Sequence, residues 1–318
     1  MDIIQLLPDH VANQIAAGEV IQRPASAIKE MLENALDAGS SDIQVYIKDA
    51  GRTLLQVVDN GCGMSKKDVE MCFKKHATSK IKNANDLFNI QTMGFRGEAL
   101  ASIAAIAHVE VKSKLTNTEL GSHLIIQGNK IQNHEDCATA NGSSIKVKNL
   151  FYNVPARRKF LKSDKVEMRH ITEEFMRIAL ANPKIKMQLS HNNTKIFHLT
   201  ESNFRKRIVN ILGEKRNETL VPISEKTSLV KISGFIGKPD IAKKTRGEQY
   251  FFVNKRFIKS HYLNHAVVKA FEEVIPQNYF PSYFINLEID TELIDINIHP
   301  TKTEIKFEDE KAIYAIIR

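Results

Sequence analysis

The sequence contains few cysteines and no long apolar run. Its 318 residues include three cysteines, Cys62, Cys72 and Cys137, whose spacing fits no metal-binding pattern. No stretch approaches the roughly 18 to 20 apolar residues that a membrane helix needs. The start, Met1-Asp2-Ile3-Ile4, is acidic and lacks the basic, apolar character of a signal peptide. We therefore expect a cytoplasmic protein with reduced thiols and no membrane partner.

The positive charge of the chain is unevenly distributed. The formal net charge is +8, with hydrophobic and charged residues at the ordinary globular values of 42% and 26%. Residues 201–269 hold fifteen Lys and Arg against six acids, whereas residues 270–318 hold four against ten. A second basic cluster, Arg157-Arg158-Lys159, is followed by Lys162, Lys165 and Arg169. Such clusters attract nucleic acid, although many charge runs are only solvated surface.

One short run combines acidic and amide side chains with a helical apolar pattern. Residues spaced by three or four share a helix face, so Glu30, Asn34 and Asp37 lie together. The opposite face carries Ile28, Met31, Leu32 and Ala35. A carboxylate and a carboxamide one turn apart suit Mg²⁺ coordination and orientation of a water molecule. An ordinary acidic surface helix is the alternative, but the combination favours a nucleotide site.

The turn Asp59-Asn60-Gly61-Cys62-Gly63-Met64 follows a predicted hairpin of strands Ile43–Ile47 and Leu54–Val58. An aspartate at the end of a buried strand can accept a hydrogen bond from an exocyclic amine, such as that of adenine. The glycines after it let the backbone approach a flat ring. Closure of a hairpin by an Asp-Asn-Gly turn explains the same residues equally well.

Residues 76–100 predict a phosphate site. His76-Ala77-Thr78-Ser79-Lys80 leads into a polar loop, and Gly94-Phe95-Arg96-Gly97-Glu98-Ala99-Leu100 then opens a helix. Free backbone N–H groups and the positive end of a helix can hold phosphates, while a loop of this length is often a lid. The segment is neither a P-loop nor a dinucleotide fingerprint, since it lacks their lysine and glycine spacing.

The remaining pattern predicts two domains of mixed α and β structure, divided near Glu201–Gly213. A helix is predicted from Ala12 to Val20 and another after Arg23-Pro24. The first domain has further strands at 109–112, 123–127, 144–147, 187–190 and 196–199, and a helix at 169–179. The second has strands at 230–236, 250–253, 283–289 and 294–299, and a helix at 262–274. We see no internal repeat and no low-complexity tract.

The sequence resembles the N-terminal portion of the MutL family of DNA mismatch repair ATPases, within the gyrase, heat-shock chaperone, histidine kinase and MutL (GHKL) superfamily. The Glu-x-x-x-Asn and Asp-x-Gly-x-Gly elements mark the superfamily, whereas Gly94 to Leu100 and Pro155 to Phe160 are specific to MutL-type proteins. The matching stretches span nearly the whole chain: Ala12 to Val20, Arg23-Pro24, Glu30 to Gly39, Asp59 to Met64, His76 to Lys80, Gly94 to Ser102, Gly142 to Val147, Phe151-Tyr152-Asn153 with Pro155 to Leu161, and His299-Pro300-Thr301-Lys302.

The resemblance implies an α+β protein. A GHKL (Bergerat-type) α/β sandwich at 1–200, with a lid at about 76–98, would precede a smaller ribosomal-S5-like domain at 201–318. Family members also carry a C-terminal dimerisation domain, which we expect to lie outside these residues, so no nuclease site is assigned here.

The resemblance also implies site roles. Glu30 is expected to orient the attacking water, Asn34 to bind Mg²⁺ and Asp59 to bind adenine. Lys302 is expected to reach the γ-phosphate from the second domain, and His299 to be a structural turn residue. The other expected nucleotide-binding residues are Asp37, Gly63, Met64, Thr78, Ser79, Lys80, Gly94, Phe95, Arg96, Gly97, Glu98, Ala99, Leu100 and Ser143. Ser143 replaces a threonine that is common in the family and keeps the hydroxyl.

The expected function is that of an ATP-driven switch in mismatch repair, with ATP and Mg²⁺ as cofactors. Nucleotide binding would order the lid and the N-terminal segment, two copies would associate as a homodimer, and slow hydrolysis would release them. Expected partners are double- and single-stranded DNA, a MutS-like mismatch recognition protein, and a downstream nuclease or helicase. DNA phosphates would be held without sequence reading by Arg157, Arg158, Lys243, Lys244, Arg246, Lys255 and Arg256.

Two alternatives remain. The chain could be a nucleotide-gated DNA clamp and scaffold whose hydrolysis is incidental. It could also be a chaperone-like or topoisomerase-like relative that shares only the ATP fold, although the MutL-specific stretches argue against this.

Overall fold

A computed structural model describes residues 3, 5–81, 83, 86, 92–94, 96–296 and 303–318. The chain forms two compact units. The first consists mainly of Met1–Lys82, Thr92–Met176 and Lys184–Thr200, and the second mainly of Arg177–Pro183 and Glu201–Arg318. The described residues include no helix with both the length and the apolarity needed to cross a bilayer.

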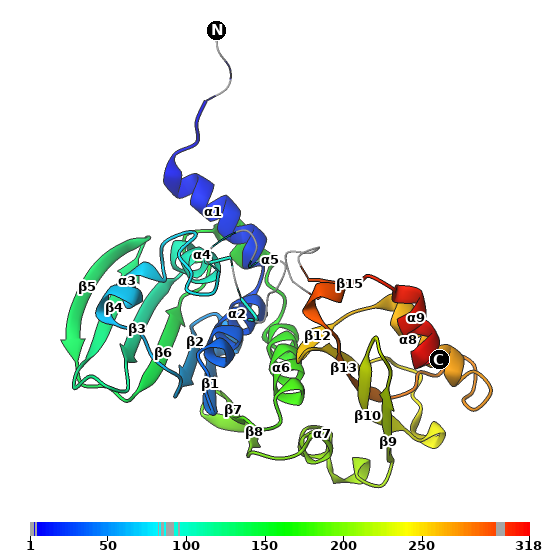
Figure 1. The fold of residues 1–318 in the computed structure, drawn as a ribbon. Coiled ribbons are helices and arrows are strands. Elements are labelled where there is room, and N and C mark those ends of the chain that lie inside the picture. The colour runs from blue at the N-terminus through cyan, green and yellow to red at the C-terminus, as the bar shows by residue number, and fades with distance from the viewer. Residues whose placement is uncertain are drawn as a thin grey trace. The chain divides into compact units, whose positions relative to one another are not determined.

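The first unit is built on an eight-stranded sheet with the order β5-β4-β3-β6-β2-β1-β7-β8 (Figure 1). Neighbouring strands are antiparallel except for β1 and β7, which are parallel. The strands are β1 (Asp42–Lys48), β2 (Leu54–Asp59), β3 (His108–Lys114), β4 (Gly121–Gln127), β5 (Lys130–Cys137), β6 (Gly142–Lys148), β7 (Lys186–His191) and β8 (Thr194–Leu199).

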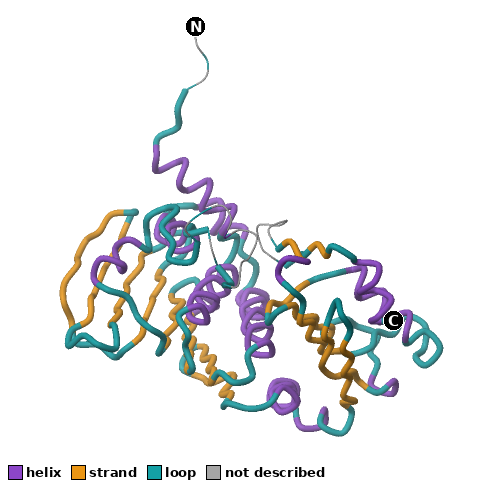
Figure 2. The backbone as a smooth tube through the Cα atoms, in the orientation of Figure 1, coloured by secondary structure: helices purple, strands orange, loops and turns teal. Residues whose placement is uncertain are grey.

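Helices cover one face of this sheet. Side chains alternate along a strand, so Ile43, Val45 and Ile47 of β1 are all buried on the helical face, while the residues between them are only half-buried. Figure 2 shows helices packed over the central strands. The helices of the first unit are α1 (Asp9–Val20), α2 (Pro24–Asp37), α3 (Lys66–Met71), α4 (Ala99–Ile106), α5 (Pro155–Phe160) and the first turns of α6 (Asp164–Ala181), and a short 3-10 helix η1 (Asp49–Gly51) joins β1 to β2. Helices α2, α3 and α4 contact the strands, α1 packs on α4, and α5 buries no residue.

The second unit has a five-stranded sheet with the order β12-β11-β13-β10-β9, in which only β11 and β13 are parallel. Its strands are β9 (Leu220–Lys226), β10 (Lys231–Gly237), β11 (Gln249–Val253), β12 (Arg256–Ile258) and β13 (Tyr283–Glu288), with a separate pair β14 (Ile294–Asp295) and β15 (Lys306–Phe307). Its helices are α7 (Phe204–Leu212), α8 (His261–Ala270) and α9 (Glu310–Ile317), with 3-10 helices η3 (Glu214–Arg216), η4 (Pro239–Ile241) and η5 (Thr291–Leu293).

Both faces of the second sheet are buried. On one face Phe251 and Ile285 pack with residues of α8 and α9. On the other face Phe252 and Phe284 pack with α7 and the end of α6. Burial on both faces explains the nearly continuous apolar run Tyr250-Phe251-Phe252-Val253 in β11.

The α+β fold class is confirmed, and several elements differ from the prediction. The hairpin of β1 and β2 forms with Ile43 opposite Asp59. The helix predicted to reach Val274 ends at Ala270, and β14 covers only the first two residues of the strand predicted at 294–299. Residues 297–302 lie outside the described part. The prediction omitted α3, α5, α7, α9, β5, β9, β12 and β15.

Candidate functional site

Helix α2 separates core and site residues as its sequence predicts. Ile28, Met31 and Leu32 are at most 1% exposed, and Pro24 starts the helix at a position where its missing N–H costs nothing. Glu30, Asn34 and Asp37 are half-buried on the other face. The Glu30 carboxylate forms no hydrogen bond or ion pair with a described residue. It is therefore available to a ligand or to water.

The Asn34 and Asp37 oxygens converge on one cation, the Lys80 ammonium group. Lys80 Nζ donates to Asn34 Oδ1 at 3.0 Å and to Asp37 Oδ2 at 2.6 Å. The backbone N–H of Gly94 also donates to Asp37 Oδ2, and that of Met93 donates to Asp37 Oδ1. Residues up to 57 positions apart in sequence thus meet on the polar face of α2.

The two flanks of the predicted lid also meet each other. The N–H of His76 donates to the carbonyl of Gly97 at 3.0 Å. Gly97 has a φ of +64°, and a Cβ at this position would lie 2.5 Å from the Ala77 carbonyl, so only glycine fits here. Glu98 then precedes α4, whose first residues are Ala99 and Leu100. The helix start therefore lies directly after the glycine segment, as predicted.

Asp59 ends β2 and is 8% exposed. Its Oδ1 accepts hydrogen bonds from Gly61 N at 2.9 Å and Ser40 Oγ at 3.2 Å. Burial raises the pKa of Asp59, and hydrogen bonds from Gly61, Ser40 and the Ser143 backbone only partly offset this rise. A buried carboxylate with donors but no cation beside it is a strong acceptor for a ligand N–H.

Ser113 joins two predicted segments, although it was not itself predicted as a site residue. Its hydroxyl accepts from Met64 N at 2.9 Å, and it lies 3.0 Å from the Gly142 carbonyl and 2.9 Å from Ser143 Oγ. Ser113 lies one residue beyond the strand predicted at 109–112. If that strand is extended by one residue, the alternation of side chains places Ser113 on the same face as Val109 and Val111.

Gly63 also has a structural reason for its place in the turn. Its φ is +71°, and a Cβ there would lie 2.0 Å from the Lys114 carbonyl.

The remaining predicted nucleotide-binding residues differ in exposure. Thr78 is half-buried and its hydroxyl accepts from Lys80 N, whereas Ser79 and Arg96 are exposed. Phe95, His299 and Lys302 lie outside the described residues, so their predicted roles stay predictions.

The structure separates the seven predicted DNA-binding residues into different environments. Arg158, Lys244, Arg246 and Lys255 are exposed. Lys243 forms an ion pair with Glu248, and Arg256 is only 7% exposed, so its guanidinium would have to turn outward to reach a phosphate. The Arg157 guanidinium lies against Gly18 of α1. A Cβ added to Gly18 would be only 3.2 Å from Arg157 Nη2. Lys243–Arg246 and Lys255 lie at opposite ends of β11.

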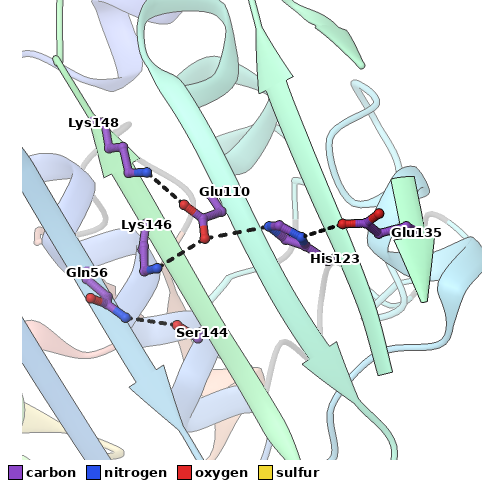
Figure 3. Close-up of polar contacts among 7 residues, drawn as sticks. All are labelled: Gln56, Glu110, His123, Glu135, Ser144, Lys146 and Lys148. Atoms are coloured by element: carbon purple, nitrogen blue, oxygen red, sulfur yellow. Dashed lines mark hydrogen bonds and ion pairs between the residues drawn. The ribbon is translucent and has the colours of Figure 1, made fainter. Parts of the chain in front are cut away.

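The helix-free face of the first sheet carries a separate polar network (Figure 3). Glu110 of β3 accepts from Lys148 Nζ at 2.7 Å and from Lys146 Nζ at 3.1 Å. His123 of β4 lies 3.6 Å from Glu110 and 3.3 Å from Glu135 of β5. Partial burial raises the pKa of Glu110, but the hydrogen bonds and charges of Lys148 and Lys146 outweigh it and lower the pKa to about 2.

A cavity of about 290 Å³ lies in the first unit. Its apolar lining comes from Phe73, Ala101, Ala105, Ile126 and Ile131, and Asn13 of α1 is also among its residues. Its lining contains none of the predicted nucleotide-binding residues, so it does not define the nucleotide site.

The residues on α2 fit a magnesium ion. Asn34 Oδ1 and Asp37 Oδ2 already share a positive charge, that of Lys80. No group of three or more His, Cys, Asp or Glu side chains suitable for a metal occurs among the described residues. Proteins often hold Mg²⁺ with one or two side chains while phosphates and water supply the other ligands, so an amide oxygen and a carboxylate oxygen that converge on one cation suit it.

Comparison with known proteins identifies two family segments. Residues 22–155 match the family described as histidine kinase-, DNA gyrase B-, and HSP90-like ATPase. Residues 208–318 match the C-terminal domain of DNA mismatch repair proteins. The first segment contains α2, Asp59 and the two flanks of the predicted lid.

Solved structures have the same fold. The N-terminal domain of a DNA repair protein superposes with a TM-score of 0.81 at 27% identity, covering 96% of this chain and 95% of that chain. The Aquifex aeolicus MutL ATPase domain complexed with ADP gives 0.66 at 24% identity, covering 85% and 93%. At that identity the second likeness shows the fold alone.

Sequence relatives cover the whole chain. The DNA mismatch repair protein MutL of Christiangramia forsetii is 64% identical over 317 residues, which are 100% of this chain and 51% of that protein. MutL of Flavobacterium psychrophilum is 61% identical over 316 residues, which are 99% and 52%. The chain thus spans about half the length of these relatives. Since both family segments and the MutL alignments agree, the chain belongs to the MutL family of DNA mismatch repair proteins and carries their ATPase region.

Proposed function

We propose that this chain binds ATP with Mg²⁺ and hydrolyses it slowly to ADP and phosphate. The observation that carries the proposal is the arrangement on α2. Asn34 and Asp37 share a cation, while Glu30 on the same face has no hydrogen bond to a described residue. A metal-binding face beside an available carboxylate is what phosphoryl transfer to water requires.

Each residue has a proposed role. Glu30 orients the attacking water, Asn34 holds Mg²⁺, and Asp59 accepts the adenine amine. The Gly94–Leu100 backbone and Lys80 hold the phosphates, and Lys302 of a second domain at 201–318 contacts the γ-phosphate. Mg²⁺, when bound, neutralises phosphate charge. The MutL ATPase domain of Aquifex aeolicus, which has the same fold, is described with ADP, and this supports the choice of an adenine nucleotide.

We also propose that ATP binding leads to dimerisation through the N-terminal segment and the lid. Ile3 is 92% exposed, Leu6 97% and Leu7 51%, so the segment before α1 carries apolar side chains with little cover. Exposed apolar side chains close together in sequence are typical of association surfaces. A second copy that covers them would remove this apolar area from water.

We also propose a role in mismatch repair, which membership of the MutL family supports. In that role the chain binds DNA without sequence preference, contacts a MutS-like mismatch recognition protein and is coupled to a downstream nuclease or helicase. Arg158, Lys244, Arg246 and Lys255 are exposed basic residues suited to phosphate contacts. Because such contacts release counterions, DNA binding should weaken steeply as salt is raised.

Replacement of Glu30 tests the hydrolytic role. Glu30→Ala should lower kcat by about 10²- to 10⁴-fold, because a positioned base typically contributes that much. Binding of a fluorescent ATP analogue should change little, since Glu30 acts on water. Glu119→Ala is the matched control, as Glu119 is an exposed glutamate with no hydrogen bond or ion pair to a described residue. An unchanged kcat in Glu30→Ala would contradict the role.

The same variant separates two forms of the proposal. If hydrolysis drives repair, Glu30→Ala in the whole protein should fail to complement a repair-deficient strain. If the chain is a nucleotide-gated clamp with incidental hydrolysis, ATP-dependent DNA association and complementation should both persist.

Molecular mass in solution tests dimerisation and the metal role together. Wild-type chain should double in mass with a non-hydrolysable ATP analogue and Mg²⁺, whereas Asn34→Ala should remain a monomer. Unchanged mass despite measured nucleotide binding would contradict dimerisation through these elements. It would mean that closure occurs within one chain or needs the half of the relatives that this chain does not span.

A further inference from the structure

The short helix α5 carries an aromatic ring that the fold leaves uncovered. Phe160 ends the helix and is 79% exposed, and α5 has no buried residue. Among the described residues no other phenylalanine is classed as exposed. A large apolar side chain is normally buried because removing its surface from water is favourable. Phe160 is thus a candidate contact for something outside the described fold.

The segment that carries Phe160 is anchored at its base. Arg52 Nη2 donates to the Lys162 carbonyl at 2.6 Å, and Arg52 Nε donates to Asp164 Oδ1 at 2.9 Å. The Lys162 N–H donates to Glu167 Oε1 at 2.9 Å, and Glu167 is only 1% exposed. These bonds fix the backbone two residues after Phe160. The exposed ring therefore stands on an anchored segment.

The basic side chains near Phe160 in sequence are not neutralised by ion pairs with described residues. Arg158, Lys159, Lys162 and Lys165 are exposed, and none of these side chains has a hydrogen bond or ion pair with a described residue. The nearest acid in sequence, Asp164, is already paired with Arg52. An aromatic ring surrounded by unpaired cations matches a polyanion that also offers flat apolar faces, which is an unpaired nucleic acid strand.

We propose that Phe160 is a stacking platform for an unpaired DNA base, with Arg158, Lys159 and Lys162 holding the adjacent phosphates. This inference rests on the proposed DNA binding and adds a preference for single strands. In a duplex the bases already stack on each other, so the ring has no free base to contact and only the cations act. One stacked base changes affinity by roughly 5- to 150-fold.

The absence of tryptophan makes a direct test possible, because the chain contains none. Phe160→Trp places a single indole at the platform and keeps an aromatic ring. Titration of the 318-residue variant with an oligothymidylate at low salt should quench its fluorescence, while a duplex should quench it little. Leu120→Trp, at a loop position that is 56% exposed, is the control and should respond to neither.

Binding measured by anisotropy of labelled DNA completes the test. Phe160→Ala should weaken single-strand binding by roughly 5- to 150-fold and duplex binding by less than about twofold. Phe160→Tyr should retain wild-type single-strand affinity, because a phenol ring also stacks. Thermal unfolding followed by circular dichroism should be the same for all three chains, since α5 buries no residue.

Other outcomes overturn the platform in distinguishable ways. If DNA binds but the indole is not quenched, or if Phe160→Ala weakens single strands and duplexes equally, the platform is wrong and the proposed DNA binding stands. If no DNA binds at low salt, both fail. If the indole signal changes with protein concentration or nucleotide in the absence of DNA, the ring belongs to a protein interface instead.

Discussion

Two carboxylates on opposite faces of the first sheet have pKa values shifted in opposite directions. Asp59 of β2 faces the helices, and burial raises its pKa. Glu110 of β3 lies on the helix-free face, where Lys148 and Lys146 lower its pKa to about 2 despite partial burial. The two strands are separated only by β6. Asp59 lies opposite Ser143 of β6 and Glu110 lies opposite Lys146, three residues further along β6, so strand alternation and this register place the two carboxylates on opposite faces.

The contrast predicts which carboxylate is available to a ligand and which stabilises the fold. Asp59 accepts from a hydroxyl and a backbone N–H but has no cation, so a ligand N–H adds a favourable interaction. Glu110 already receives two ammonium groups that join β3 to β6. Removing Asp59 should therefore affect nucleotide binding, and removing Glu110 should affect stability. The three predictions below test this division.

The largest effect is expected for Asp59→Asn. Nucleotide affinity should fall by roughly 10- to 150-fold, which corresponds to loss of a hydrogen bond to a charged acceptor, about 1.5 to 3 kcal/mol. Isothermal titration calorimetry with an ATP analogue measures it. The free energy of unfolding should stay equal to wild type or rise, because a neutral amide costs less to bury than a carboxylate. An affinity within threefold of wild type would contradict the adenine role.

A smaller effect is expected for Glu110→Gln. The free energy of unfolding should fall by about 1 to 2 kcal/mol, because two charge-assisted hydrogen bonds are lost at partly exposed lysines. Urea denaturation at neutral pH measures the change, and Glu119→Gln at an exposed, unpaired position should change it by less than about 0.5 kcal/mol. Nucleotide affinity should remain at the wild-type value. A loss of affinity equal to that of Asp59→Asn would break the division between the two faces.

The smallest effect is the pH dependence of the difference in free energy of unfolding between wild type and Glu110→Gln. The pKa of Glu110 is about 2 in the folded chain against an ordinary 4.5, so between these values the unfolded chain binds a proton that the folded chain does not. The stabilisation by Glu110 is complete above about pH 4.5 and declines as the pH falls toward 2. Wild type and Glu110→Gln should therefore converge in stability when urea titrations are repeated at successively lower pH. A constant difference would mean that Glu110 contributes through packing instead of charge.

Sequence reasoning succeeded where a local pattern was strong. The amphipathic spacing of α2 and the alternation of β1 and β2 placed Glu30, Asn34, Asp37 and Asp59 correctly on their elements. It failed where the pattern was weak. β5 is an edge strand with few buried residues, so it lacks the apolar alternation that marks a half-buried strand. α3 and α5 have only six residues each, too few to show a helical period.

The burial of individual charged side chains could not be predicted from the sequence either. Arg256 and Lys255 are neighbours in a basic stretch, yet one is 7% exposed and the other lies in the solvent at a turn. Lys255 lies in the turn between β11 and β12, whereas Arg256 begins β12 and is buried in the second unit. A charge count along the chain cannot distinguish such neighbours, because it contains no information about faces.

The family, the α+β class and the placement of the predicted nucleotide-binding residues on α2 and β2 could be read from the sequence, because they depend on motif residues and on spacing within single elements. The tertiary structure alone decided that Lys80 meets Asn34 and Asp37 across 46 and 43 residues and that Ser113 joins Met64 to Ser143. It also decided that β1 pairs with β7 in parallel. These contacts depend on burial and pairing of distant segments, which the folded chain sets as a whole and which no local pattern contains.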